Sequence, residues 1–258
     1  MPTRRKIKID VHFTPSQLDE LQLKDKNVVV IDVLRSSTTI AMALQNGARE
    51  IIPVADIESA VKISGSLFGE VVLRGGERNG KMIEGFNLGN SPGEYTGQAV
   101  RGKSIIFMTT NGTAAMVKGR YAKNLIVAGF VNLSTVVEFL CGLQSDIMIV
   151  CAGKEHRFCI EDSVCAGKII TKLTRELGND VVIGDGSRAA VALDHAEGRS
   201  ILKMLKSSDH GKYLTEIGFA DDLKVCAQLD SIPVLPVLSG SVIRLSKESP
   251  KPSRQAKN

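Results

Sequence analysis

Short aliphatic runs recur along the first 150 residues, and most of them are continuous rather than alternating with polar positions. They occupy residues 28–34, 71–73, 105–108, 125–131 and 147–151. Continuous runs of this length are typical of strands that are buried on both faces of a sheet. We therefore expect five buried strands here.

Amphipathic stretches separate these runs, at residues 38–46, 57–67, 114–121 and 133–143. Each begins near Ser, Thr, Asp or Asn, and several end near Gly, as helices do. The alternation of strands and helices favours right-handed crossovers and helices on both faces of one sheet. The pattern predicts an α/β fold, a three-layer α/β/α sandwich around a mainly parallel sheet.

The pattern becomes helical after residue 161. The apolar residues on one face of the first predicted helix are Val164, Ile169, Ile170, Leu173 and Leu177. Further helices are expected at 189–193 and 201–205, and the short run 181–183 is compatible with a strand or a helix.

We expect residues 1–245 to form one catalytic domain, and a division into two subdomains near 178–187 stays open. The polar segment 246–258 has too few apolar side chains to fold, so it is predicted to be a disordered tail.

The composition agrees with this class of fold and argues against nucleic-acid and membrane partners. Twenty-four glycines and 4% aromatic residues, without Trp, suit aliphatic strands joined by tight turns. The net charge of +5 comes partly from the two ends of the chain, and no basic stripe is interleaved with aromatic residues. We expect no nucleic-acid partner. No apolar run approaches the roughly 20 residues that cross a bilayer, so no membrane partner is expected either.

The five cysteines indicate a reducing environment. They are Cys141, Cys151, Cys159, Cys165 and Cys226. They lack CxxC spacing and stand in apolar company, which is typical of core residues rather than zinc ligands. No stretch resembling a signal peptide follows Met1. We expect reduced thiols and a cytoplasmic protein.

Polar residues follow several of the predicted strands, where an open α/β sheet binds its ligands. After the first run, Asp32 and Arg35 precede Ser36, Ser37 and Thr38, which open a helix. Free N–H groups at a helix N-terminus and an arginine together favour an anion. The structural alternative is that a serine caps the helix and that Asp32 pairs with Arg35.

The segment 75–80 follows the second run. Its paired glycines allow a ligand to approach the backbone, while Glu77 and Arg78 supply opposite charges. The alternative is a surface hairpin with its turn at Asn79 and Gly80.

Downstream, Ser91 is followed by Pro92 and Glu94, a pattern that predicts a capped helix start. Asn90 and Ser91 would face the same rim of the sheet as the other polar turns.

A second polar turn follows the run at 105–108 and repeats the arrangement after the first strand. It consists of Thr109, Thr110, Asn111, Gly112 and Thr113. Two such turns indicate a ligand with two anionic groups, such as phosphate together with sulfonate or carboxylate. Two ordinary capped helices are the alternative.

Glu161 and Asp162 open the long predicted helix. Acidic residues favour helix N-termini in any protein. Together with Asp32 and Glu77, however, they offer the hard oxygen ligands that Mg²⁺ takes, so we expect these four carboxylates to hold magnesium.

The histidines give a weaker signal. His156, between a strand and a helix, is a candidate acid or base. The other three, His12, His195 and His210, have no neighbouring motif.

Taken in order, the segments VIDVLRSSTTI, GGERNG, GFNLGNSP, MTTNGT, CAG and IED resemble the 2-phosphosulfolactate phosphatases of coenzyme M biosynthesis. They span residues 28–167. The resemblance implies a three-layer α/β/α fold with a mixed sheet, a magnesium requirement, and release of phosphate from 2-phospho-3-sulfolactate to leave sulfolactate. Where the family often has Ala-Thr after the arginine, this chain has Ser36 and Ser37.

The sequence therefore predicts a small anionic phosphoester as substrate. The residues expected to be catalytic are Asp32, Arg35, Glu77 and Asn111. Those expected to bind substrate are Ser36, Ser37, Thr38, Arg78, Asn90, Ser91, Thr109, Thr110, Gly112 and Thr113. Magnesium would polarise the phosphoryl oxygens, while Arg35 and helix amides spread the developing charge.

Metal-activated water is favoured over attack by Asp32, because the chain lacks the Asp-x-Asp pair of haloacid-dehalogenase phosphatases. Two other functions stay open: a non-catalytic sensor of an anionic metabolite, and a phosphatase for another small phospho-acid. A homo-oligomer is also expected.

Overall fold

The computed structural model describes residues 5–16, 18–66, 71–155 and 157–246. The tail predicted from the sequence lies outside the described residues except for Ser246, whose N–H donates to the carbonyl of Leu235 at 2.9 Å. His156, the candidate acid or base, also lies outside them.

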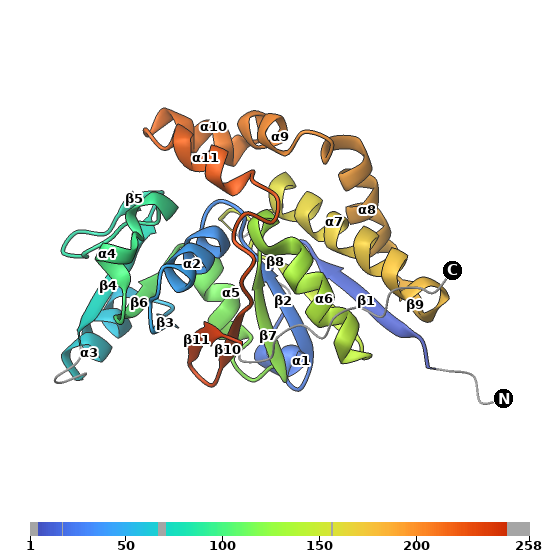
Figure 1. Ribbon diagram of the computed structural model, residues 1–258, viewed down its shortest axis with the longest axis horizontal. Helices are drawn as coiled ribbons and strands as arrows, with labels where there is room; N and C mark the ends of the chain where they lie inside the picture. Colours follow the sequence, from blue (N-terminus) through green and yellow to red (C-terminus); the bar gives the residue numbers. More distant parts are fainter. Residues whose placement is uncertain (1–4, 17, 67–70, 156, 247–258) are drawn as a thin grey trace.

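One mixed sheet of eleven strands organises the described chain (Figure 1). In chain order the strands are β1 (Ile7–His12), β2 (Asn27–Ile31), β3 (Glu50–Pro53), β4 (Val72–Arg78), β5 (Lys81–Met82), β6 (Ser104–Met108), β7 (Asn124–Ala128), β8 (Ile147–Cys151), β9 (Val181–Ile183), β10 (Pro236–Ser239) and β11 (Val242–Leu245). In space the order is β5-β4-β6-β3-β11-β10-β7-β2-β8-β1-β9.

The sheet consists of two parallel groups joined by a hairpin. Neighbours are parallel within β4-β6-β3 and within β7-β2-β8-β1-β9. The C-terminal hairpin β10–β11 lies between the groups and pairs antiparallel with β7 and β3. The mixed, mainly parallel sheet is thus confirmed, whereas the sequence analysis missed this hairpin, together with β1 and β3.

The α-helices account for most of the remaining described chain. They are α1 (Glu20–Leu23), α2 (Ser36–Gln45), α3 (Ile57–Ser66), α4 (Gly97–Val100), α5 (Gly112–Lys118), α6 (Leu133–Leu143), α7 (Ile160–Leu177), α8 (Asp185–Glu197), α9 (Ile201–Ser207), α10 (Asp209–Glu216) and α11 (Ala220–Cys226). Within the described part of the chain, none of the helices combines the length and apolar composition that crossing a bilayer requires.

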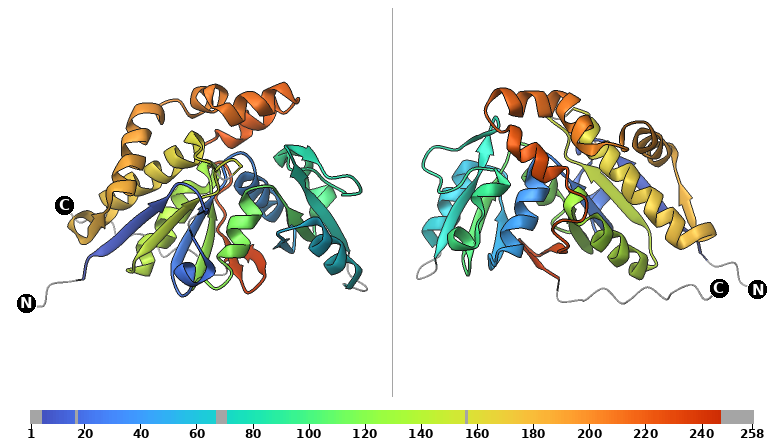
Figure 2. Two further views of the ribbon diagram at one scale, coloured as in Figure 1. Left: turned by 180° about the vertical axis from the view of Figure 1, so that it is seen from behind. Right: turned by 45° about the horizontal axis from the view of Figure 1, so that its top comes forward.

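Strand β2 shows why its aliphatic run is continuous, since all five of its residues are buried. Val29 and Ile31 belong to a core that includes residues of α6 and α7, whereas Val28 and Val30 belong to a second core with residues of α2 and α5. Helices α6 and α7 lie on one face of the sheet in Figure 1, and the view from behind in Figure 2 shows α5 on the other. The three-layer sandwich is confirmed.

Helices α9, α10 and α11 leave the sandwich and lie together at the top of Figure 1, in orange, above the loops that follow the central strands. The tilted view of Figure 2 shows the same arrangement. We call these three helices the cap. Residues of α10 and α11 contact the loops that follow the strands, so the cap forms one wall of the cavity described below.

The strand predicted at 125–131 needs correction, and the ambiguous run at 181–183 is resolved. The run predicted as a strand at 125–131 ends at Ala128, and Phe130–Asn132 form a 3₁₀ helix. The Asn132 side chain ends the strand, because it accepts from the N–H of Gly129 at 2.9 Å and donates to the Val127 carbonyl. The ambiguous run 181–183 is strand β9, which pairs with β1 in the same sheet.

Burial of the cysteines leads to a testable expectation. Cys151, Cys159, Cys165 and Cys226 are buried, and Cys141 is half-buried. Burial raises the pKa of the Cys226 thiol to about 12 and raises the pKa of Cys151 well above its usual value. The thiolate is the reactive form of cysteine. Burial therefore lowers the reactivity of these thiols in two ways, because it keeps reagents away and because the raised pKa keeps the thiols protonated.

We therefore expect iodoacetamide at pH 8 to add one group to the native protein, at Cys141, and five groups after denaturation. Intact-mass spectrometry over an hour measures this directly. Rapid addition of two or more groups to the native protein would contradict the buried positions.

Candidate active site

A cavity of about 220 Å³ lies where the loops after the central strands meet the cap. The residues that line it are Asp32, Leu34, Arg35, Ser36, Glu77, Asn79, Gly80, Asn90, Thr110, Asn111, Lys154, Glu155, His210, Tyr213 and Leu214. Ligand sites for drug-sized molecules measure roughly 300–1,000 Å³. A cavity of this size suits a smaller and more polar ligand.

Asp32 follows β2 and is buried in the cavity wall. The Ser36 hydroxyl donates to its Oδ2 at 2.7 Å, and the Asp32 N–H donates to the Ser37 hydroxyl at 3.0 Å. Burial raises the pKa of Asp32, and the hydrogen bond from Ser36 opposes that rise. The serines thus bind the turn of Asp32, and neither caps the helix that follows.

Arg35 does not pair with Asp32, so the structural alternative for these two residues is wrong. Its Nη1 donates to the buried Asp222 carboxylate of α11 at 2.6 Å, and its Nη2 donates to the Gly80 carbonyl at 2.6 Å. The guanidinium also lies 4.2 Å from the centre of the Phe219 ring. Arg35 is 1% exposed, so its orientation is determined by the cap.

Glu77 lies at the end of β4 and is buried in the cavity wall, beside the loop that follows β6. Its carboxylate accepts from the N–H of Thr110 at 2.7 Å and from the N–H of Gly80 at 2.6 Å. Gly76, at φ +133°, is required here, because a Cβ would overlap the Met108 carbonyl. These contacts join the ends of β4 and β6.

Arg78, by contrast, is exposed and is not among the residues that line the cavity. Asn79 and Gly80 both have positive φ and connect β4 to β5 as a tight hairpin turn. The hairpin turn at Asn79 and Gly80 is therefore present, and both of these residues also line the cavity.

The turn after β6 divides into structural and cavity-lining residues. Thr109 and Thr113 bind each other, with the Thr109 N–H donating to the Thr113 hydroxyl at 3.0 Å and the Thr113 N–H donating to the Thr109 hydroxyl at 3.1 Å. Thr110 and Asn111 line the cavity. The Asn111 side-chain oxygen accepts from the N–H of Glu155 at 2.9 Å, which ties this turn to the loop after β8.

Asn90 contributes a buried acceptor to the cavity. It is 4% exposed, and its Oδ1 has no hydrogen-bond partner among the described residues. A buried polar atom without a partner costs free energy unless a ligand or water satisfies it. Ser91, next to it, lies outside the lining, and its hydroxyl donates to Asp222 at 2.6 Å. Pro92 begins a 3₁₀ helix as predicted.

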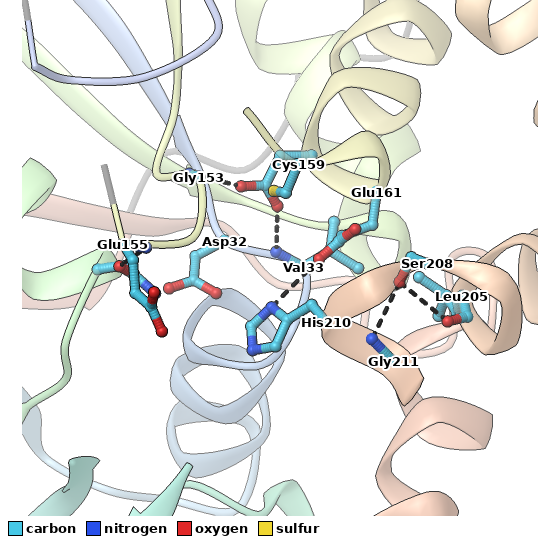
Figure 3. Close-up of polar contacts among 12 residues, drawn as sticks. Asp32, Val33, Gly153, Glu155, Cys159, Glu161, Leu205, Ser208, His210 and Gly211 are labelled. Atoms are coloured by element: carbon cyan, nitrogen blue, oxygen red, sulfur yellow. Dashed lines mark hydrogen bonds and ion pairs between the residues drawn. The ribbon is translucent and has the colours of Figure 1, made fainter. Parts of the chain in front are cut away.

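Glu161 and Asp162 are buried at the start of α7, but neither lines the cavity. Asp162 accepts from the N–H of Val33 at 2.8 Å and of Gly153 at 3.0 Å, so it joins the loops after β2 and β8. The two donor residues are labelled in Figure 3. Burial, followed by the nearby Asp32 carboxylate, raises the pKa of Asp162 well above its usual value. Glu161 faces His210, with its Oε1 3.2 Å from the ring Nδ1.

The four carboxylates expected to hold magnesium therefore do not form one cage. Among the residues that the structure describes, no three His, Cys, Asp or Glu side chains cluster at metal-ligand spacing. Magnesium, however, is usually held by one or two carboxylates with water and substrate phosphate completing its shell. Asp32 and Glu77 in the cavity wall, with the unpartnered Asn90 Oδ1, fit that pattern.

Three of the expected substrate-binding residues remain to be placed. Ser37 and Thr38 face the protein interior beneath the turn of Asp32, where the Thr38 hydroxyl lies 3.5 Å from the Val33 carbonyl. Gly112 begins α5, and a Cβ there would lie 2.5 Å from Asp32 Oδ2. All three support the cavity wall from outside the lining.

The sequence analysis missed Lys154, Glu155 and the residues of the cap. Lys154 lies three residues after the end of β8, so the strand-end rule could have found it. Its Nζ lies 4.7 Å from the centre of the Tyr213 ring. His210 and Tyr213 belong to α10, where no local motif marks them, because only the packing of the cap over the sheet brings them to the cavity.

The close packing of Gly112 gives one prediction. The Gly112→Ala change places a methyl group 2.5 Å from Asp32 Oδ2 and 2.7 Å from Ser36 Oγ, so Asp32 must move. Misplacement of a catalytic group by about 1 Å can cost about 100-fold in rate, and we expect at least that loss in phosphate release. The matched control is Gly142→Ala in α6, where a Cβ meets nothing within 4 Å. Equal activity of the two variants would contradict the packing.

The charge pair of Arg35 gives a second prediction. Replacing Asp222 by Ala leaves Arg35 buried without its counter-charge, a change that typically costs about 3–5 kcal/mol of unfolding free energy. Urea unfolding measures it. Asp221→Ala, at the neighbouring exposed position, is the control and should unfold like the wild type. If both variants unfold alike, Asp222 does not hold the cap.

Comparison with known proteins identifies the family of this chain. A sequence model of the family described as 2-phosphosulpholactate phosphatase matches residues 12–241. A protein of Thermotoga maritima is 43% identical over 225 residues, covering 87% of this chain and 94% of its own length. One of Caldanaerobacter subterraneus subsp. tengcongensis is 38% identical over 240 residues, covering 93% and 99%.

A protein of Carboxydothermus hydrogenoformans is 40% identical over 230 residues, covering 89% of this chain and 92% of its own length. All three relatives carry the name probable 2-phosphosulfolactate phosphatase. The match extends from β1 through the cap to the C-terminal hairpin, so it includes every segment that lines the cavity. The chain belongs to the 2-phosphosulfolactate phosphatase family of phosphoric monoester hydrolases.

Proposed function

We propose that this protein is a magnesium-dependent phosphatase that hydrolyses 2-phospho-3-sulfolactate to sulfolactate and phosphate. The observation that carries the proposal is the composition of the cavity wall, where two buried carboxylates, Asp32 and Glu77, face the same space as Lys154 and Arg35. Carboxylates alone would repel a phosphate ester, whereas carboxylates that hold a cation attract it.

The substrate class follows from charge and size. A phosphorylated hydroxy acid with a second acidic group carries several negative charges on a small frame. Lys154 supplies a positive charge to the cavity. The first N–H groups of α2, those of Ser36 and Ser37, are already bound to Asp32 and do not add to it. The names of the relatives support 2-phosphosulfolactate among such compounds. In a cell that makes coenzyme M, the reaction would belong to that pathway.

Asp32, Glu77 and the Asn90 side-chain oxygen are the residues proposed to hold magnesium. When bound, the metal supplies Lewis-acid polarisation of the phosphoryl group and lowers the pKa of coordinated water. Arg35 stays fixed by Asp222 and faces the cavity as a stationary positive charge. Free cysteines throughout the described chain support a reducing compartment, and we propose the cytosol.

The decisive experiment is a phosphate-release screen over 2-phosphosulfolactate, phospholactate, phosphoglycerate and sugar phosphates, with magnesium and with EDTA. We expect turnover of 2-phosphosulfolactate that EDTA abolishes and added Mg²⁺ restores. Turnover that EDTA leaves intact would remove the metal from the proposal. Tight binding of the ester without turnover would indicate a sensor instead.

Asp32 is expected to be essential under this proposal. Asp32→Asn keeps the shape of the side chain and can still accept the hydrogen bond from Ser36, so the fold should persist. Loss of one of two anionic metal ligands should lower kcat by at least about 100-fold and raise the Mg²⁺ concentration needed for half-maximal activity. Asp10→Asn on β1, which lies outside the cavity lining, is the control. Wild-type metal dependence in Asp32→Asn would show that Asp32 is not a ligand.

A further inference from the structure

His210 occupies a fixed position on the cavity wall although no sequence motif marks it. It lies in the first turn of α10, two residues after the N-cap Ser208. The Ser208 hydroxyl accepts from the Gly211 N–H at 3.0 Å and donates to the Leu205 carbonyl at 3.0 Å (Figure 3). The Tyr213 hydroxyl, one turn further on, donates to the Asn79 carbonyl at 2.9 Å across the cavity rim. These bonds fix the backbone that carries the imidazole.

The imidazole is oriented by a buried carboxylate. Its Nδ1 lies 3.2 Å from Oε1 of Glu161, which is 1% exposed. A carboxylate can only accept, so Nδ1 is the donor in this contact. Oε2 of Glu161 has no hydrogen-bond partner among the described residues. The described hydrogen bond of this carboxylate is therefore the one between Oε1 and His210.

This orientation leaves Nε2 available on the cavity side, since His210 is a lining residue and its other ring nitrogen is occupied. A carboxylate that binds one nitrogen of an imidazole fixes which nitrogen carries out proton transfer. His210 and Asp32 both line the cavity, and Figure 3 shows the imidazole in contact with Glu161. Among the described lining residues, His210 is the one imidazole.

Hydrolysis of an alkyl phosphate needs such a group. The departing oxygen of a hydroxy acid leaves as an alkoxide, which is a poor leaving group unless it is protonated as the bond breaks. Other lining groups are less suited. Arg35 does not release a proton, and the Tyr213 hydroxyl is bound to Asn79. Asp32 and Glu77 are assigned to the metal and Lys154 to the charge of the ester, while Glu155 is exposed.

We propose that His210, carrying a proton on each ring nitrogen when the ester binds, is the catalytic acid that donates its Nε2 proton to the leaving-group oxygen, and that Glu161 is the positioning residue that holds Nδ1–H. The inference rests on the proposed phosphatase function. The oxygen of water forms a bond to phosphorus, the ester P–O bond breaks with its electron pair on the ester oxygen, and that oxygen takes the proton from Nε2. The proton that the attacking water loses returns to the imidazole, so each turnover restores the starting state.

The test uses full-length His210→Asn with His195→Asn, on α8 outside this cavity, as the matched control. Two quantities are measured: kcat with the ester, and the inhibition constant of inorganic phosphate, which binds the same site but has no leaving group. We expect kcat to fall by about 10²- to 10⁴-fold in His210→Asn, with the phosphate inhibition constant within about threefold of wild type.

Glu161→Gln separates positioning from structure. It should lower kcat by about 10- to 100-fold. The double variant with His210→Asn should be no slower than His210→Asn alone, because the two residues serve the same function and its loss counts only once. A merely structural Glu161 would give additive losses.

Each other outcome overturns the assignment. Unchanged kcat in His210→Asn means that another group protonates the leaving oxygen, and a parallel loss of phosphate affinity means that His210 binds substrate instead. These results differ from failure of the proposed function, in which the wild-type protein itself releases no phosphate from any ester in the screen.

Discussion

One buried charge pair, between Arg35 after β2 and Asp222 in α11, joins the cap to the loops above the sheet. Both side chains are shielded from solvent, and their remaining hydrogen bonds reach two further segments, since Arg35 binds the Gly80 carbonyl and Ser91 binds Asp222. A buried pair of this kind adds little net stability, yet removing either partner is costly. Together with the cap residues that pack into the main core, the pair favours one placement of the cap over the cavity.

The same pair determines the charge of the site. Because Asp222 already neutralises Arg35, the positive charge available to an anionic ester comes mainly from Lys154, and the carboxylates of Asp32 and Glu77 oppose it. Burial of Asp32 disfavours its charged form in the absence of a cation. A divalent metal would relieve both problems at once, which is why the proposed function includes one.

The proposed chemistry is divided between two layers of the molecule. The sheet supplies the carboxylates and the backbone of the phosphate site, through loops that Asp162 and Glu77 tie together. The cap supplies His210, and α7 supplies the Glu161 that orients it. Attack on phosphorus would thus depend on the sheet, whereas protonation of the leaving group would depend on how the cap sits over it.

Local sequence determined the elements whose causes are local. Continuous apolar runs predicted β2, β6 and β8 because these strands are buried on both faces. Polar residues after β2 and β6 and at the end of β4 predicted Asp32, Asn111 and Glu77 in the cavity. Tertiary structure alone decided the rest. The hairpin β10–β11 pairs with strands more than a hundred residues away, and Arg35 pairs with Asp222, 187 positions away. Local sequence cannot predict pairings at such distances. His210 reaches the cavity for the same reason: only packing of the cap brings an unremarkable helix residue to Glu161.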